Sequence, residues 1–299
     1  MLDFVIYVFT ISAIYGMLAL SLNLQTGVTG LLNFGQVAFF GVGAYATGIV
    51  ALNGGSWIVG VLVGIVVASL LGIVVGRLGR TLAADYWAIV TLALAECFRL
   101  IVTNESAWTG GPQGIGGIPG PFASDSALVV SLAWLGACVA LLATTYFISQ
   151  RLTETQFGRV LRLLREQPLL TESLGHNVTA SKVRLLMIAA PIGALAGSFY
   201  TLYISFIGPG QLLPIETFLV FTMLIVGGMG NMRGAIVGAL VVQLIYSGSR
   251  FLKDIFPIPP ENAGSIRVLI VGATLTAFLL WRSEGLFPER LRKLDADRS

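Results

Sequence analysis

The chain carries very little charge for its length. Only 11% of its 299 residues are Asp, Glu, Lys or Arg, whereas 56% are hydrophobic. A soluble domain carries about 25% charged residues, because its surface faces water. The composition therefore excludes an ordinary soluble protein and predicts that most of the surface faces lipid. The net charge of +3 is small and gives no indication of nucleic-acid binding.

Cysteine and histidine are almost absent. Cys97 and Cys138 lie inside apolar runs, and His176 is the single histidine. This set excludes a disulfide framework and a histidine-rich metal site. The sequence also lacks a phosphate-binding loop, a paired-histidine zinc motif and a nucleophile elbow. We therefore predict that the chain is not an enzyme and holds no cofactor. If the chain takes part in a process powered by ATP, another chain must bind the ATP and its Mg²⁺.

Positive charge is missing from the first part of the chain. Asp3 is the only charged residue before Arg77, and no clear small-residue cleavage site follows residues 4–24. A secretory signal peptide has a basic first region. We therefore expect residues 4–24 to be a retained membrane helix.

Long apolar runs fill most of the sequence. A helix needs about 20 residues to cross a bilayer, and these runs do not show the short alternating pattern of a membrane β-barrel. We expect an all-α polytopic membrane protein with about 8–10 transmembrane helices, some of them broken. The apolar runs cover residues 4–24, 28–52, 57–76, 82–103, 127–149, 185–207, 214–230, 234–250 and 264–281.

The basic residues predict the orientation. They cluster at 77–80, at 151–184 and at 282–298, whereas the loop 104–126 has no Lys or Arg. Because basic loops stay on the cytoplasmic side, we place the three clusters inside and the loop 104–126 outside. Nine full spans would put the N-terminus outside, whereas a broken helix or two half-passes at residues 25–43 would change the count and could put it inside. We expect one membrane domain over residues 1–281, with a cytoplasmic loop at 150–184, followed by a basic cytoplasmic tail at 282–299.

Two apolar regions are interrupted by glycine and polar residues. They are residues 25–43, with five glycines, and residues 208–234. Interrupted membrane helices in the two halves of a chain often line a transport path. The alternative is that the glycines allow close helix packing. Under the first hypothesis the path candidates are Asn23, Asn33, Gln36, Tyr45 and Asn231.

One apolar run carries an acid and a base. Glu96 and Arg99 are three residues apart, so they can pair on one face of a helix. A charged side chain at the centre of a bilayer costs about 2.5–3.5 kcal/mol on insertion scales, and pairing reduces that cost. The pair is either a gate in the path or an anchor at the helix end.

The loop 150–184 contains signals for a short helix at about 168–175. Pro168 suits a first helical turn, and Gly175 suits a left-handed cap. Such a helix would expose Thr171 and Glu172, with Leu174 beside them. Either a protein partner would bind this helix, or the helix would lie as an amphipathic helix on the anionic inner leaflet.

Five stretches of the sequence carry a recognisable pattern in a fixed order: residues 23–45, 86–96, 109–114, 158–166 and 226–238. Taken together, they resemble the permeases of branched-chain amino acid ABC importers, of the LivM type. The sequence departs from that family at residues 171–175, where Thr-Glu-Ser-Leu-Gly stands in place of an alanine-rich pattern that often ends in Leu-Gly.

The resemblance implies a fold and a set of partners. The fold would be that of a type II ABC importer permease. The partners would be a second, LivH-like permease, two cytoplasmic ATPases and a periplasmic substrate-binding protein, all at the bacterial inner membrane. The segment 168–176 would be the coupling helix that docks in an ATPase groove, through Pro168, Thr171, Glu172, Leu174 and Gly175.

The implied function is the import of branched-chain or other neutral amino acids, powered by the separate ATPases. One alternative is an ABC permease for urea, short amides or polar amino acids. Another, from a different class, is a stand-alone secondary transporter driven by an ion gradient. The scarcity of buried ionisable residues argues against proton coupling, but not against sodium coupling.

Overall fold

The computed structural model describes residues 2–79, 82, 84–122, 126–248, 269, 272–278, 280, 282 and 285–289. Five of its helices are long and apolar enough to cross a membrane. They are α1 (Leu2–Leu22), α3 (Trp57–Leu78), α4 (Ala84–Asn104), α6 (Ala127–Glu154) and α9 (Val178–Ile204). Helix α1 is prolonged by a π-helical segment, η1, at Asn23–Val28.

Both interrupted regions are breaks in the helical backbone. After η1 the chain leaves helical geometry and re-enters it in α2 (Gln36–Leu52), which has only 17 residues. Further on, α10 (Pro214–Gly227) and α11 (Met232–Gly248) meet at an angle of 118°. The sequence prediction of broken helices is therefore confirmed.

The number of membrane-crossing helices in the described part of the chain differs from the sequence count. It is five, or six if α10 and α11 form one bent span. The prediction of 8–10 counted α2, α10 and α11 as separate full spans, because apolar length alone does not show where a helix starts late or bends. It also counted 264–281, half of which lies outside the described residues.

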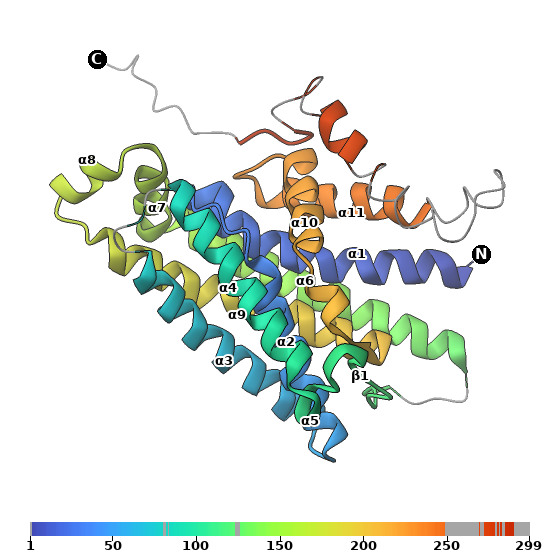
Figure 1. Ribbon diagram of the computed structural model, residues 1–299. Coiled ribbons are helices and arrows are strands. Elements are labelled where there is room, and N and C mark those ends of the chain that lie inside the picture. Colours follow the sequence, from blue (N-terminus) through green and yellow to red (C-terminus); the bar gives the residue numbers. More distant parts are fainter. Residues whose placement is uncertain are drawn as a thin grey trace.

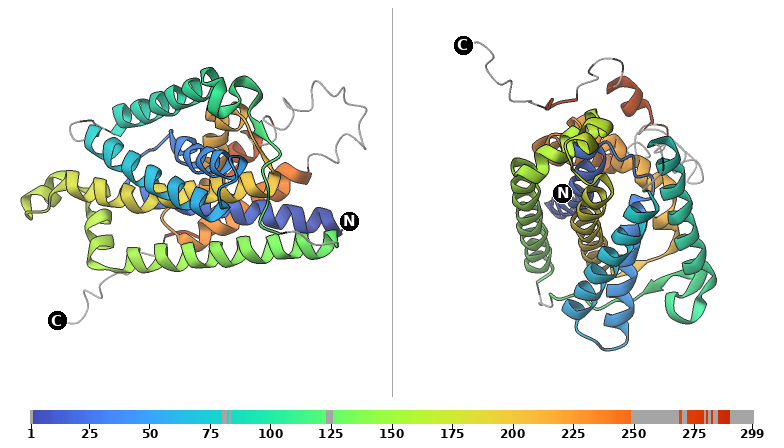
Figure 2. Two further views of the ribbon diagram at one scale, coloured as in Figure 1. Left: turned by 90° about the horizontal axis from the view of Figure 1, so that it is seen from below. Right: turned by 90° about the vertical axis from the view of Figure 1, so that its left-hand side faces the viewer.

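Two helices form the centre of the bundle. In the most apolar stretch of α1 78% of the residues are buried, and in that of α9 72%, against 11–28% in α3, α4 and α6. Helix α9 packs on α2 and α3, while α1 packs on α6, α9 and α11. The views of Figure 1 and Figure 2 show α6 lying along α1 at one side of the bundle. The exposed outer helices present the lipid-facing surface that the composition predicts.

Glycines allow α2, α3 and α9 to approach closely. A Cβ on Gly43 of α2 would lie 1.9 Å from the carbonyl oxygen of Ala194 in α9, and one on Gly197 would lie 1.9 Å from that of Phe40. Such contacts between small residues hold membrane helices together through van der Waals packing. In residues 25–43, therefore, the broken helix and the close glycine packing are both present.

The loop that the sequence places outside is tied to the end of α9. It contains α5 (Ser106–Thr109), η2 (Gly111–Gln113) and strand β1 (Ile115–Gly116). Strand β1 pairs antiparallel with β2 (Phe206–Ile207), and η3 (Pro209–Leu212) follows β2. In Figure 1 these elements lie at the end of the bundle opposite to α8 (Pro168–Ser173).

Candidate functional site

The loop between α6 and α9 folds into two helices. Helix α7 (Gln156–Glu166) is capped by Thr155, whose hydroxyl accepts a hydrogen bond from the Gly158 amide at 3.3 Å. It crosses the end of the bundle with Leu161 and Leu164 buried beneath it. Helix α8 then projects beyond the neighbouring helices (Figures 1 and 2). The loop between α6 and α9 therefore forms a projecting helix, α8, at the end of the molecule where the basic residues lie.

Helix α8 has the ends that its sequence predicts. Pro168 occupies the first turn, and Gly175 has φ +82° just after the helix. The Gly175 amide donates to the Glu172 carbonyl at 2.9 Å, and the His176 amide donates to the Thr171 carbonyl at 3.2 Å. These two bonds form a Schellman cap, which satisfies carbonyls that the last turn leaves free. The helix proper ends at Ser173, so Leu174 and Gly175 belong to its cap.

The exposed face of α8 is mainly apolar. The side chains of Leu169, Leu170 and Leu174 are 80%, 43% and 61% exposed, and Glu172 is exposed beside them. Thr171 is fully buried, contrary to its predicted exposure. Its hydroxyl turns back and donates to the Gln167 carbonyl at 3.0 Å, while α8 packs against α9. The exposed side chains of α8 and its cap are thus mainly leucines, with Glu172 and Ser173 beside them.

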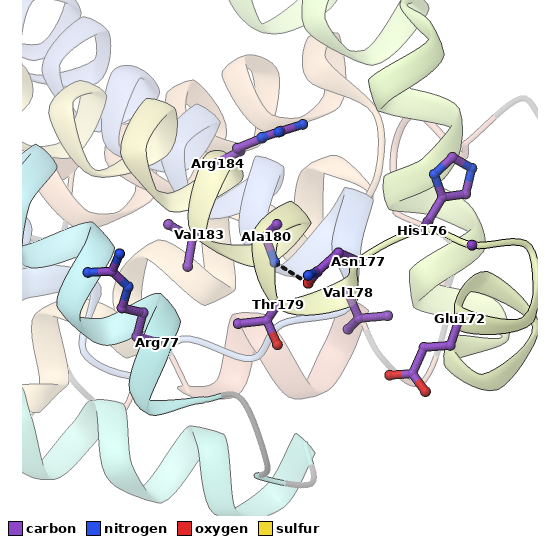
Figure 3. Close-up of a pocket in the computed structure, with 10 residues that line it drawn as sticks. Arg77, Glu172, His176, Asn177, Val178, Thr179, Ala180, Val183 and Arg184 are labelled. Atoms are coloured by element: carbon purple, nitrogen blue, oxygen red, sulfur yellow. Dashed lines mark hydrogen bonds between the residues drawn. The ribbon is translucent and has the colours of Figure 1, made fainter.

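A cavity of about 950 Å³ opens between α8, the start of α9 and the end of α3. Figure 3 shows Glu172 and His176 at one side of it and Arg77, from α3, at the other. Asn177 caps α9 by accepting a hydrogen bond from the Ala180 amide at 2.9 Å. One side of α8 therefore borders an open cavity, which is lined by both acidic and basic side chains.

A carboxylate near the end of the chain joins α7 to both helix breaks. Glu289 lies 2.8 Å from a guanidinium nitrogen of Arg165 and 3.4 Å from Nε of Arg162. Arg165 also donates to the carbonyl of Gly27 in η1. The segment containing Glu289 runs along the other break, where the Phe287 amide donates to the Gly227 carbonyl at 2.9 Å. A displacement of α7 would therefore act on both breaks.

The contacts of Glu289 with Arg162 and Arg165, which we call the Glu289 clamp, are not predicted by the sequence. The sequence predicts only a basic tail at residues 282–299, and the extent of that tail stays a prediction, because residues 290–299 lie outside the described residues. No local pattern distinguishes Glu289 from the other acidic residues near it. Its arginine partners lie far away in the sequence, so the fold alone brings them together.

Replacing Glu289 with glutamine should destabilise the protein by about 1–3 kcal/mol. The variant keeps the side-chain shape but removes the charge-assisted hydrogen bond to Arg165, and bonds of that kind contribute about 1.5–3 kcal/mol. Unfolding of the purified protein in detergent measures the change. Glu166→Gln is the matched control, because Glu166 is exposed and 3.7 Å from Arg165, and exposed pairs contribute about 0–1 kcal/mol. Equal, small changes in both variants would contradict the clamp.

The polar residues of the first break form a buried hydrogen-bonded cluster. Gln25 donates to the Gln36 side chain at 2.8 Å and accepts from Asn33 at 2.7 Å. Gln36 donates to Ser21 at 2.8 Å, and Ser21 donates to the carbonyl of Ala189 in α9 at 2.6 Å. Buried amides need such partners, because an unpaired one costs about 1–3 kcal/mol. The cluster therefore holds the broken segment against α9.

The other path candidates take up separate positions. Asn23 is fully buried and accepts a hydrogen bond from the Gly230 amide at 2.9 Å, which links the two breaks. Asn231 lies at the second break, where its amide group is 3.4 Å from the Pro288 carbonyl. Tyr45 is buried in α2, and its hydroxyl has no hydrogen-bond partner within the described residues. Asn33 borders a largely apolar cavity of about 220 Å³ between α2, α3 and α4. Their role as path lining stays a prediction.

Glu96 and Arg99 form the ion pair that the sequence predicts. Nε of Arg99 donates to Glu96 at 2.9 Å, and the side chains of Glu96 and Arg99 are 39% and 22% exposed. The pair lies apart from the buried Gln25 cluster, on the outer helix α4. Its geometry fits a gate and an anchor equally, so both hypotheses remain.

Comparison with known proteins identifies the family. The family described as "Branched-chain amino acid transport system / permease component" matches residues 4–279. A probable branched-chain amino acid transport permease protein LivM of Methanocaldococcus jannaschii is 30% identical over 318 residues, which cover 93% of this chain and 91% of the relative. The LivM permease protein of Escherichia coli is 28% identical, with coverage of 93% and 69%. The LivH permease protein of Salmonella typhimurium is 23% identical, with coverage of 89% and 91%. The chain therefore belongs to the permease components of branched-chain amino acid ABC transport systems, as a multi-pass transmembrane subunit without an ATPase domain.

Proposed function

We propose that this protein imports branched-chain or other neutral amino acids into the cell as one permease of an ABC importer. Its LivM relatives from Salmonella typhimurium and Escherichia coli are described as parts of high-affinity branched-chain amino acid transport systems. LivH permeases with the same description occur in the same two organisms. These names support pairing of this chain with a LivH-like permease. They equally support a location in the plasma membrane, which is the inner membrane in such bacteria.

Helix α8 is the observation that carries the proposal. A helix of six residues, with Pro168 in its first turn and a Schellman cap at its end, projects from the basic end. The helix and its cap expose three leucines. Exposed leucines on a short rigid helix match the apolar anchors of a helix that docks in a groove of a partner protein. We assign this groove to the cytoplasmic ATPases, which in this proposal bind the ATP and the Mg²⁺. A periplasmic binding protein delivers the amino acid at the opposite end.

The Glu289 clamp supports a route from the ATPases to the membrane segments. Docking moves α8 and, through the chain, α7. Arg165 on α7 holds both Gly27 and Glu289, so the motion reaches η1 and the break between α10 and α11. These two breaks are where a path can open and close without unwinding a whole helix. Coupling between the ATPases and the membrane segments travels through packed side chains and ion pairs. The Glu289 clamp supplies such a connection.

Purification from native membranes tests the proposal. We expect two ATPases and a second permease to co-purify with this chain. Proteoliposomes that contain the complex should then take up labelled leucine only with ATP inside and the binding protein outside. Uptake by this chain alone under a sodium gradient would overturn the proposal in favour of a secondary transporter. Uptake of urea in place of leucine would overturn the proposed substrate.

A further inference from the structure

A polar cavity that is open at one side lies beside α10. It measures about 280 Å³ and lies between α1, α9, α10 and α11, next to η3. Since η3 follows β2, the cavity is near the end of the bundle that receives substrate in the proposed function. Its polar lining consists of Tyr7, Tyr15, Tyr200, Gln211, Glu216, Gln243 and Tyr246.

Among the described residues that line this cavity, Glu216 is the single charged one. One of its carboxylate oxygens accepts a hydrogen bond from the Tyr15 hydroxyl at 3.0 Å. Among the described residues no lysine or arginine forms an ion pair with it. It lies in the first turn of α10, where the helix dipole favours a negative charge. Burying an ionisable side chain inside a membrane bundle costs free energy. The first hypothesis is therefore that Glu216 has a function and binds a partner group.

The groups around Glu216 suit a cation. A carboxylate has about four acceptor sites, and Tyr15 fills one of them. Gln243 is 3% exposed, and its Oε1 has no hydrogen-bond partner in the described part of the chain, whereas its Nε2 donates to Ser247 at 3.1 Å. Four tyrosine rings complete the wall, and the face of such a ring attracts cations. The cavity thus offers free acceptor oxygens and tyrosine side chains to a group with several N–H donors.

We propose that this cavity is a substrate subsite, in which Glu216 binds the α-ammonium group of the transported amino acid. The inference rests on the proposed function. An ammonium group has three donors, which match the Glu216 carboxylate and Oε1 of Gln243. The positive end of α10 offers a favourable site for the substrate carboxylate, and Ile11 adds an apolar wall for the side chain. At about 30 Å³ per water, the cavity holds roughly nine water-sized groups, enough for a small aliphatic amino acid.

The test uses the complete importer in proteoliposomes, with its binding protein outside, ATP inside and labelled leucine as the probe. For Glu216→Gln we expect leucine uptake per ATP hydrolysed to fall by about tenfold or more, because hydrogen bonds to charged groups contribute about 1.5–3 kcal/mol. Stimulation of the ATPase by the leucine-loaded binding protein should persist, since α8 is untouched. Glu216→Asp keeps the charge and should restore part of the uptake. Glu105→Gln, in the exposed outer loop, is the matched control and should behave as the wild type.

The outcomes separate the two proposals. Normal uptake per ATP in Glu216→Gln would overturn the subsite while leaving the importer function intact. Equal loss of uptake in Glu216→Gln and Glu216→Asp, with ATPase stimulation also lost, would show a structural role and overturn the subsite as well. If the wild-type complex does not transport leucine, the proposed function fails first. A requirement of wild-type uptake for external sodium, abolished in Glu216→Gln, would assign the cavity to a metal cation and overturn ammonium binding.

Discussion

Replacing Leu170 and Leu174 together with alanine should abolish ATP-driven uptake without unfolding the permease. Both side chains are exposed on α8 and its cap, so their loss should change the stability of the isolated chain by about 0.5 kcal/mol or less. In a docked complex they would be buried, and burying a leucine contributes about 1.5–3 kcal/mol. Losing two contacts weakens docking by about 3–6 kcal/mol, a hundredfold or more. Co-purification of the ATPases, their stimulation and leucine uptake measure the effect.

The control for this double variant lies at the other end of the bundle. Leu52, at the end of α2, is 44% exposed, so Leu52→Ala removes the same chemical group from a surface that meets no ATPase in the proposal. It should leave uptake and ATPase stimulation unchanged. Normal coupling in the α8 double variant would reject α8 as the docking element. It would favour the alternative of an amphipathic helix that lies on the inner leaflet. Glu172→Ala tests the carboxylate of the same surface by the same measurements.

The second large effect concerns the packing of α2 on α9. Gly43→Ala should destabilise the protein, because the added Cβ would lie 1.9 Å from the carbonyl oxygen of Ala194 and 2.5 Å from its carbonyl carbon. Backbone atoms cannot turn aside as a side chain does, so one helix must move. Overpacking of this kind costs about 1–3 kcal/mol, occasionally more. Thermal unfolding in detergent and the yield of folded protein measure the loss.

A glycine-to-alanine substitution in α6 should not destabilise the protein. Gly136 lies within α6, and a Cβ there meets nothing within 4 Å. Alanine is more favourable than glycine inside a helix by roughly 0.5–1 kcal/mol. Gly136→Ala should therefore leave the protein as stable as the wild type or slightly more stable. A similar loss of stability in the two variants would show that glycine contacts do not hold α2 against α9.

Local signals in the sequence predicted the elements whose cause is local. Apolar runs of about 20 residues indicate membrane helices because each helix satisfies its own backbone hydrogen bonds in lipid. Pro168 and Gly175 predicted both ends of α8, since a first turn and a left-handed cap depend on those residues alone. Glycine and polar residues likewise marked the two breaks. The spacing of Glu96 and Arg99 predicted their ion pair for the same reason.

The tertiary structure decided every feature that joins distant parts of the chain. Thr171 is buried because α8 packs on α9, which its own helical pattern does not show. Glu289 meets Arg162 and Arg165, and Glu216 faces α1 across its cavity, only once the bundle has formed. The sequence by itself therefore determined that this is a membrane bundle with two broken segments and a projecting helix. Where charges and amides that are distant in the sequence pair was decided by the fold, because burial in a low-dielectric interior makes each unpaired polar group costly.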